Sequence, residues 1–553
     1  MSNKKKKQSA PLTPSDVTFY ILSLFVSAYA CVLFIAMPLI THNKYYDIGD
    51  YKYKMFMYIS VWFLIFSLLI FLVYFILQIT SHKITKESAL ATLKSLSTLD
   101  WFVIAFLIAS FLSYILSPYK TNEYHLFNEE MLNKPWDGYT GWNMGLRSQI
   151  IFVLLYFLIS RAFRKGWKND FLMIVLGSAS IVFILGILHR FYIDPMDFYT
   201  GLDDYYKLKF LSTLGQSSWY SSFMVIILPI GMSLFLYQQN RKSIQNILLG
   251  IFVGIGAATF VTQNSDSAYL AYFYTLVLLF AVSFKDNDRF LKFLEMLIIV
   301  LGSFKIIGIF QKLFPERIPA LDSMSIFMSQ SIVTWILLVL VVVFYLLMRK
   351  VCKKESFTIT KFTKVRTVLV ILAVACLPLG ILFVYLNTKG LLPTDMFRSI
   401  EYLNFNDGWG NNRGFTWRNT FEVLRDPSWY KRALTGPGPD CYDEIMYATE
   451  PRASQIRNYW HGEIVVCAHN EWLNMLFNEG ILGIVSYLGI FISGAILFIK
   501  EKENPLMIAG TGAIIAYFLH NMFCYQQILC TPMIFCIIGY CEYFRRNRES
   551  KDL

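Results

Sequence analysis

The feature that most constrains this chain is a succession of apolar runs separated by short polar turns. A helix of about 20 apolar residues crosses a hydrocarbon core of about 30 Å, and the runs reach or approach that length. Hydrophobic residues make up 56% of the 553 residues and charged residues only 16%. A soluble chain of this length could not bury so much apolar surface. The sequence therefore predicts an all-α polytopic membrane protein with about fourteen transmembrane helices.

The predicted spans divide the chain into three parts. Residues 1–387 hold the N-terminal spans, residues 388–470 form a large extracytoplasmic loop, and residues 471–553 hold the C-terminal spans and a basic tail. The spans are expected near 17–40, 53–80, 99–117, 148–163, 171–192, 217–238, 247–263, 267–284, 291–310, 331–348, 367–386, 471–499, 506–524 and 529–544.

Clusters of lysine and arginine predict the orientation of these spans. They begin at Lys4, Arg161, Arg349 and Phe544. Cationic residues in short loops resist translocation, and an even number of spans puts all the clusters on one side, so both termini are expected in the cytoplasm. The net charge of +12 then indicates membrane anchoring, and no nucleic-acid partner is expected. The first span is too long for a signal peptide and is expected to stay as an anchor.

The loop at 388–470 does not have the composition of a disordered segment, because it is rich in tryptophan and tyrosine. Apolar residues at helical spacing predict a helix over 413–426, and the sequence GPGPD at 436–440 predicts a tight turn. A second outer loop is expected at 118–147. Long ordered loops are usually functional, so the site is sought here.

Several kinds of site are disfavoured by the residue pattern. Asp286 and Asp288 form the Asp-x-Asp pair with which soluble glycosyltransferases hold a divalent cation, but they lie in a short cytoplasmic loop, where a solvated turn is expected. The nine cysteines show no metal-ligand spacing. Cys441 and Cys467 share the large outer loop, and the sequence leaves open whether they pair.

Arginines on the outer side indicate an anionic substrate. Arg413 and Arg418 lie on the predicted loop helix about 140° apart, so they need not hold one group together. Arg147 stands at the outer end of a span, where an arginine can equally contact lipid phosphates. A guanidinium binds phosphate oxygens in bidentate fashion, which makes Arg413 the main candidate for binding phosphate.

His469 is the candidate base. It begins a membrane helix, where the helix dipole favours the neutral imidazole. Glu471 lies about 200° around that helix and Glu479 lies about 15 Å along its axis, so neither is expected to orient the ring. A buried glutamate such as Glu479 is either functional or paired with another helix.

The combination of these residues resembles the C-terminal signature of the O-antigen ligase and Wzy polymerase family. Arg413-x-x-x-Trp417 is followed by a glycine-rich turn and by AHNEWLNML, which is similar to that family's H-N-x-x-L motif. The segments STLGQSSWYSS from Ser212 and RSQIIFVLLY from Arg147 are also similar to family segments. Trp417, Gly438, Asp440, Asn470 and Glu479 are expected to support the site.

The resemblance implies a metal-independent, inverting, GT-C-like glycosyltransferase on the outer face of the bacterial cytoplasmic membrane, with no cofactor. Its donor would be a glycan linked to undecaprenyl pyrophosphate. His469 would be the general base, and Arg413, with Arg147 and Arg418, would hold the pyrophosphate. One departure concerns a short outer turn, where many members carry an arginine and this chain has Ser265-Asp266-Ser267.

Three functions remain open at this stage. A polymerase would join repeat units of a surface polysaccharide, and a ligase would move a finished glycan to a lipid, wall or protein acceptor. A lipid-linked glycan flippase belongs to another class, and it is disfavoured because a flippase does not need a long ordered outer loop with arginines and a histidine. The basic, Lys-, Ile- and Tyr-rich composition is compatible with a low-GC bacterium that has no lipopolysaccharide core. This favours the polymerase over the ligase.

Overall fold

The computed structural model describes residues 12–120, 134–263, 265–317, 321–393 and 396–549. The lysine cluster from Lys4 and much of the predicted outer loop at 118–147 lie outside these residues. In the described part, β-structure is limited to the antiparallel pair β1 (Phe210–Leu211) and β2 (Gly215–Gln216). The protein is therefore an all-α polytopic membrane protein, as predicted.

Each predicted span coincides with a helix. Ten helices in the described residues are long and apolar enough to cross a membrane, and α11 and α21 are shorter apolar helices. The total of about fourteen spans stays a prediction. The helices at the predicted spans are α1 (Pro14–Leu39), α2 (Ile48–Thr80), α4 (Thr98–Leu116), α6 (Leu146–Ala162), α7 (Lys168–Arg190), α9 (Ser217–Tyr237), α10 (Ile244–Thr262), α11 (Ser267–Ser283), α12 (Asn287–Leu313), α14 (Ile332–Val351), α15 (Thr363–Thr388), α20 (Glu471–Ile499), α21 (Pro505–His520) and α22 (Thr531–Glu549).

The remaining helices are short and lie between the long ones. They connect spans or build the segment between α15 and α20. They are α3 (Lys86–Lys94), α5 (Lys134–Asp137), α8 (Asp204–Lys209), α13 (Ser323–Gln330), α16 (Trp409–Leu424), α17 (Pro427–Tyr430), α18 (Tyr442–Met446) and α19 (Glu450–Tyr459), with 3-10 turns η2 (Lys165–Trp167), η3 (Pro315–Arg317), η4 (Ile359–Phe362) and η5 (Glu401–Leu403).

Burial separates the central helices from the peripheral ones. The apolar window of α9 is 89% buried, whereas that of α14 is 6% buried and that of α15 is 0% buried. Helices that are apolar all round must be covered by protein or by lipid. Helix α9 therefore lies in the core of the bundle, while α14 and α15 present their surfaces to the hydrocarbon.

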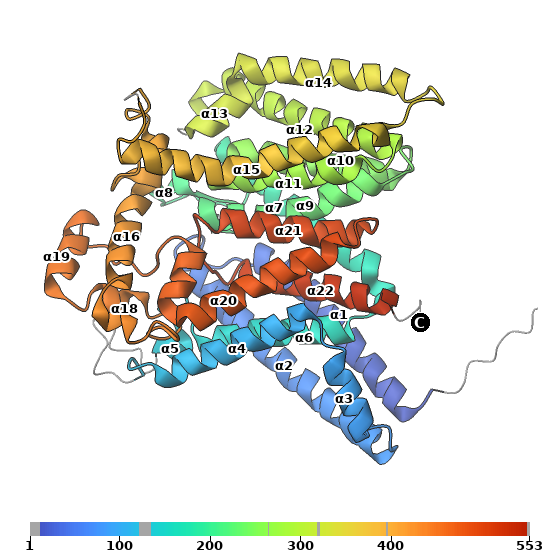
Figure 1. The fold of residues 1–553 in the computed structure, drawn as a ribbon, viewed down its shortest axis with the longest axis vertical. Coiled ribbons are helices and arrows are strands. Elements are labelled where there is room, and N and C mark those ends of the chain that lie inside the picture. Colours follow the sequence, from blue (N-terminus) through green and yellow to red (C-terminus); the bar gives the residue numbers. More distant parts are fainter. Residues whose placement is uncertain (1–11, 121–133, 264, 318–320, 394–395, 550–553) are drawn as a thin grey trace, which may run out of the picture.

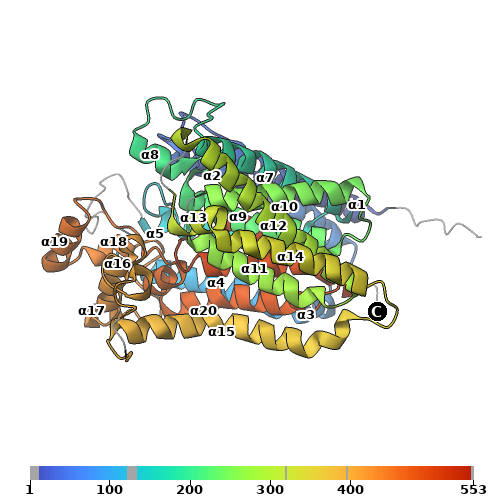
Figure 2. The same ribbon diagram turned by 90° about the horizontal axis from the view of Figure 1, so that it is seen from above.

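The segment between α15 and α20 forms a cap at one end of the bundle, where α16, α17, α18 and α19 gather (Figures 1 and 2). The cap has an apolar core of its own, which includes Phe415, Trp429 and Tyr442. That core continues onto α20 through Leu473 and Phe477. The cap is thus packed onto the start of α20.

Local backbone features explain where α16 and α20 change direction. Gly410, Asn411 and Asn412 have left-handed φ angles of 61°, 60° and 67°, so the regular part of α16 begins at Arg413. This agrees with the predicted helix over 413–426. Within α20, Gly480 has a φ of 67°, and the following N–H groups bond to carbonyl oxygens of the cap, Ile481 to Ala433 at 2.8 Å.

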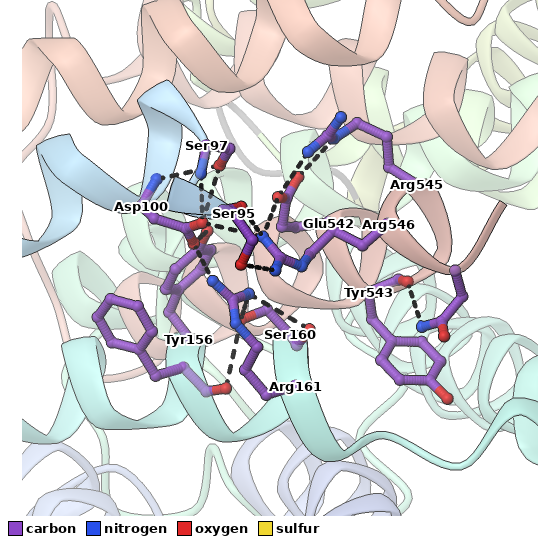
Figure 3. Close-up of polar contacts among 12 residues, drawn as sticks. Ser95, Ser97, Asp100, Tyr156, Ser160, Arg161, Glu542, Tyr543, Arg545 and Arg546 are labelled. Atoms are coloured by element: carbon purple, nitrogen blue, oxygen red, sulfur yellow. Dashed lines mark hydrogen bonds and ion pairs between the residues drawn. The ribbon is translucent and has the colours of Figure 1, made fainter. Parts of the chain in front are cut away.

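A buried ionic network joins helices at the opposite end of the bundle (Figure 3). Asp100 of α4 is fully buried, accepts a hydrogen bond from Tyr156 at 2.6 Å and pairs with Arg161 of α6 at 2.7 Å. It also pairs with Arg546 of α22 at 3.3 Å. Buried charges are tolerated only when they are paired in this way, so the network fixes α4, α6 and α22 relative to one another.

Candidate active site

Arg413 and Trp417 occupy one face of α16, because residues four apart on a helix are neighbours. The Arg413 Nε–H donates to the carbonyl oxygen of Phe523 at 3.1 Å. The Trp417 ring stacks against the Phe523 ring, with centroids 6.1 Å apart, and its Nε1–H donates to the carbonyl oxygen of Ala468 at 2.9 Å. The R-x-x-x-W motif thus connects α16 both to the turn between α21 and α22 and to the residue before His469.

His469 stands where the loop enters α20. Its φ of 48° is left-handed, a conformation that non-glycine residues adopt mainly where the surroundings impose it. On one side, the Ala468 N–H donates to Asn474 Oδ1 at 3.1 Å. On the other side, Asn470 caps α20 by accepting from the Leu473 N–H at 3.0 Å. The imidazole is therefore presented by a backbone that is held on both sides.

Two aromatic side chains surround the His469 ring. Tyr525 makes an edge contact with centroids 5.3 Å apart, and Trp142 makes a perpendicular contact at 6.5 Å. Trp142 and Tyr525 are also in edge contact with each other, at 4.1 Å. Trp142 comes from the segment before α6 and Tyr525 from the α21–α22 turn. The imidazole is thus half-buried beside two aromatic side chains.

The electrostatics of the site are dominated by Arg413. Burial lowers the pKa of its guanidinium, and within the described residues it has no carboxylate partner. Burial, and after it the charge of Arg413, lower the pKa of His469 to about 3. At neutral pH the site therefore combines a neutral imidazole with an uncompensated cation, which is an arrangement that suits an anion.

The other two predicted arginines are ion-paired. Arg418 points away from Arg413 and forms two 2.9 Å hydrogen bonds with the carboxylate of Asp407. Arg147 pairs with Asp137 at 3.0 Å and donates to the Tyr53 hydroxyl at 2.5 Å, but its buried Nε has no hydrogen-bond partner. The structure thus brings Arg413 to His469, places Arg418 in a surface pair, and leaves one donor of Arg147 free.

The predicted turn at 436–440 connects three segments. Asp440, with a φ of 56°, accepts from the N–H groups of Tyr139 and Met144 at 2.8 and 3.0 Å. The Gly438 N–H donates to the carbonyl oxygen of Asn478 at 3.0 Å, and a Cβ at Gly438 would lie 2.6 Å from Ser117 Oγ. Gly438 and Asp440 therefore hold the segment before α6, which carries Trp142, against the cap and α20.

The cap is joined to α5 by a buried ionic contact. Lys134 pairs with Asp443 and, at 3.1 Å, with Glu444, and all three side chains are at most 3% exposed. Charges buried this deeply are stable only as a group. Cys441 and Cys467 are buried free thiols, so no disulfide adds to this contact.

The two glutamates of α20 are both buried, and neither contacts His469. Glu479 accepts from Ser110 of α4 at 2.6 Å, so it contacts another helix. Glu471 accepts from Tyr487 at 2.5 Å, from Tyr517 at 3.0 Å and from Asn521. The Glu471 N–H also donates to the Asn521 carbonyl at 2.9 Å. Glu471 therefore joins the start of α20 to the turn that carries Phe523 and Tyr525.

Sequence reasoning missed the α21–α22 turn, because the apolar residues around it were assigned to two adjacent spans. The clue was its polar pair Gln526 and Gln527, which is unusual between two membrane helices. Tyr525 accepts from the Trp219 indole at 2.9 Å and donates to Gln216 at 3.1 Å. Gln149 donates to Gln526 at 3.1 Å. Both upstream segments that resembled the family, from Ser212 and from Arg147, thus reach this turn.

The turn at Ser265-Asp266-Ser267 carries a carboxyl group in place of the expected arginine. Burial, and then a contact with Asp322, raise the pKa of Asp266 to about 7. A buried arginine nevertheless stands beside the turn, since Arg190 of α7 donates to the carbonyl oxygens of Thr262 and, at 3.3 Å, Gln263. The cationic group at this place comes from another helix.

The family model described as O-antigen ligase matches residues 320–488. The match covers 169 of the 553 residues, and over that part the chain is similar to the O-antigen ligase family. The matched O-antigen ligase region includes Arg413, Trp417 and His469, so it covers the motif built above. The match supports a membrane enzyme of O-antigen or polysaccharide processing. No curated protein matches the chain.

Proposed function

We propose that the protein transfers a glycan from an undecaprenyl-pyrophosphate-linked donor and thereby polymerises surface-polysaccharide repeat units. The observation that supports this proposal most directly is the pair of Arg413 and His469. Arg413 is a partly buried cation that has no carboxylate partner in the described residues, and the neutral imidazole of His469 lies within its field. A pyrophosphate would supply the missing anion, and a hydroxyl would supply the proton that a neutral imidazole can accept.

The proposed reaction is a single displacement at the anomeric carbon. The acceptor hydroxyl oxygen bonds to the anomeric carbon while the bond from that carbon to the pyrophosphate oxygen breaks, and the electron pair leaves with undecaprenyl pyrophosphate. His469 takes the hydroxyl proton and later returns it to water. One displacement inverts the anomeric centre. Arg413 stabilises the charge that grows on the leaving pyrophosphate, which is the role of preorganised electrostatics in catalysis.

Donor binding would also activate the base. With a pKa of about 3, His469 is a poor proton acceptor in the free protein. A bound pyrophosphate would offset the charge of Arg413, which is one of the two causes of that low pKa. The basicity of His469 would then rise only when the donor is in place, so donor binding and deprotonation of the acceptor are coupled.

The remaining groups are assigned supporting roles in this proposal. Arg147 can contribute its unbonded Nε–H to the pyrophosphate, whereas Arg418 is held by Asp407 and braces the cap. Trp417, Gly438, Asp440 and Asn470 hold the loops around His469. Glu479 holds α20 against α4. We further propose a GT-C-like arrangement and a metal-independent reaction on the outer face of the bacterial cytoplasmic membrane, with both termini in the cytoplasm.

A ligase that transfers a finished glycan to a lipid, wall or protein acceptor is the second candidate, because it would use the same site chemistry. A flippase is the third candidate, since Arg413 and a general base at His469 would have no role in transport. The polymerase is favoured over the ligase only by the basic, Lys-, Ile- and Tyr-rich composition, so the reaction product must decide between these two.

The test is a reconstituted reaction in nanodiscs with an undecaprenyl-pyrophosphate-linked repeat unit, followed by analysis of the glycan by gel. A polymerase gives a ladder of lipid-linked products and releases undecaprenyl pyrophosphate with each step. A ligase needs an added acceptor and gives one product length. Movement of the donor across a vesicle without release of undecaprenyl pyrophosphate would instead show a flippase and end the enzyme proposal. Loss of activity with a chelator would end the metal-independent mechanism.

A further inference from the structure

A second polar feature lies at the end of the bundle away from the cap. Figure 1 shows that α14 ends on the side where the C-terminus lies, opposite α16 to α19. Residues from the end of α9, the start of α12 and the end of α14 line a pocket there of about 790 Å³. Six cationic side chains line it: Arg241, Lys285, Arg289, Lys292, Arg349 and Lys353.

The cations of this pocket are only partly neutralised. Arg241 and Lys292 pair with Glu295, and Lys285 and Arg289 pair with Glu503. Asp286 and Asp288 also line the pocket. Asp286 caps α12 by accepting from the Arg289 N–H at 2.7 Å, and the charge of Asp288 acts on Cys352 at the end of α14.

Two cations are left without an ionic partner. Within the described residues, Arg349 and Lys353 have neither a carboxylate nor a hydrogen-bond partner for their side chains. Both belong to the last turn of α14 and the residues after it. Against the six cations stand Asp286, Asp288, Glu295 and Glu503, so the pocket keeps an excess of two positive charges.

The surroundings of the pocket indicate what kind of anion it takes. The apolar window of α14 is only 6% buried, and Phe344 and Leu347, which precede Arg349, are 45% and 55% exposed. A span of this hydropathy ends at the level of the lipid headgroups. A cationic pocket beside an exposed apolar helix thus matches a molecule with an anionic head and hydrocarbon tails.

We propose that this pocket binds the headgroup of an anionic diacyl phospholipid, with the acyl chains lying along α14. Basic pockets between membrane helices bind anionic headgroups, and each cation near the surface contributes attraction that salt screens. This site is separate from the Arg413 site, and its test needs no glycan donor.

The test compares two double variants of the full-length protein. Arg349→Gln with Lys353→Gln removes the two unpaired cations, and Lys350→Gln with Lys354→Gln is the matched control. The control residues follow them directly in the sequence, are exposed, and do not line the pocket. Both doubles change the net charge equally, so a general effect of surface charge acts on both.

Lipid binding is measured by titrating phosphatidylglycerol or phosphatidylcholine into purified protein and following bound lipid by native mass spectrometry. We expect phosphatidylglycerol to bind more tightly than phosphatidylcholine to the wild type and the control. We expect the pocket variant to lose roughly tenfold to thirtyfold in apparent affinity for phosphatidylglycerol.

Equal losses in the two double variants, or no preference between the two lipids, would overturn the proposal. Displacement of the lipid by millimolar inorganic phosphate would also overturn it, because the pocket would then be a site for free phosphate. Monodisperse elution of each variant on gel filtration shows that it is folded.

Discussion

Arg413 and Arg418 show how much the tertiary environment decides at the scale of a residue. Both are arginines of one helix, five positions apart, and the sequence gives them similar surroundings. Arg418 meets Asp407 and forms an ordinary exposed ion pair, worth at most about 1 kcal/mol. Arg413 donates to the carbonyl oxygens of Phe523 and Gly410, its charge acts on His469, and it meets no carboxylate in the described residues. The sequence predicted that the two need not act together, but it could not assign the partners.

Replacing Arg413 tests whether it is a phosphate clamp. Lysine keeps the charge but loses the planar fork of donors, so Arg413→Lys should be nearly as damaging as Arg413→Ala. Loss of a charged hydrogen bond of this kind costs about 1.5 to 3 kcal/mol, roughly a ten- to hundredfold effect on donor affinity and turnover. Donor binding and transfer rate are measured for both variants in nanodiscs.

Arg418→Lys is the matched control, because it lies on the same helix and pairs at the surface. We expect its donor affinity and turnover to stay within about twofold of wild type. Full activity of Arg413→Lys would show that Arg413 only anchors the loop, and the clamp would then have to be sought at Arg147.

The pH dependence tests whether donor binding activates His469. In the free protein His469 has a pKa of about 3, so kcat/KM, which reports free enzyme, should show no acid limb from this group above about pH 4. With pyrophosphate bound, the pKa of His469 is expected to rise. The rate constant kcat should therefore fall as the pH drops below this raised pKa. Both parameters are measured between pH 4 and 8, and thermal unfolding at each pH checks that the protein is folded.

His469→Ala is the companion variant. It should lower kcat by about 10²- to 10⁴-fold while donor binding persists, because a general base acts on the chemical step. The acid limb of kcat should vanish from its residual activity. An unchanged acid limb, or near-normal turnover, would remove His469 from the mechanism.

At the scale of elements, the start of α20 and the α21–α22 turn act as one unit. Glu471 is two residues after His469 and bonds to Asn521, two residues before Phe523. Phe523 in turn accepts from Arg413. One buried carboxylate therefore positions the base and the arginine relative to each other, although it touches neither.

Two substitutions at Glu471 separate positioning from folding. Glu471→Ala leaves the hydroxyls of Tyr487 and Tyr517 and the amide of Asn521 without their acceptor, and each buried unsatisfied group costs about 1 to 3 kcal/mol. Glu471→Gln keeps one acceptor oxygen and should restore much of the stability. Thermal unfolding in detergent and the kinetic parameters are measured for both.

The expected kinetic signature of this positioning role is a rise in KM for the donor together with a fall in kcat. In the proposed mechanism Arg413 contacts the pyrophosphate both in the donor complex and in the transition state. A Gln variant that is folded should recover most of both parameters. If Glu471→Ala is folded and turns over the donor normally, the turn does not need Glu471 to hold Arg413.

The spans illustrate why elements were easier to predict than their contacts. A run of apolar residues such as α15 encodes a helix locally, whether lipid or protein covers it. The helix over 413–426 was also predictable, since its apolar residues recur at helical spacing. The left-handed residues Gly410, Asn411 and Asn412, which set where that helix starts, follow from the packing of the cap.

At the scale of the whole molecule, orientation in the membrane is the prediction on which the site proposal depends. A cysteine at Asn411, exposed in the cap, should react with an impermeant maleimide in intact cells. A cysteine at Glu355, exposed at the other end of the bundle, should react only after lysis. The charge bias of the loops is the physical reason.

The background for this experiment replaces Cys352 and Cys376, since the other native cysteines are buried. Protection of Asn411→Cys together with labelling of Glu355→Cys would place the cap in the cytoplasm, and the outer-face mechanism would fail.

The sequence by itself determined that this is a helical membrane protein, where its helices run, and that Arg413, Trp417 and His469 form a recognisable motif. These properties follow from hydropathy, helical spacing and local motifs, each of which depends only on residues that are near one another in the sequence. Only the tertiary structure decided that Trp142 and Tyr525, from loops far apart in the sequence, flank His469. It also decided that Arg418 is ion-paired, whereas Arg413 has no carboxylate partner among the described residues. The physical reason is that an apolar helix is equally stable against several neighbours, so the partners of its polar ends depend on which helices pack together.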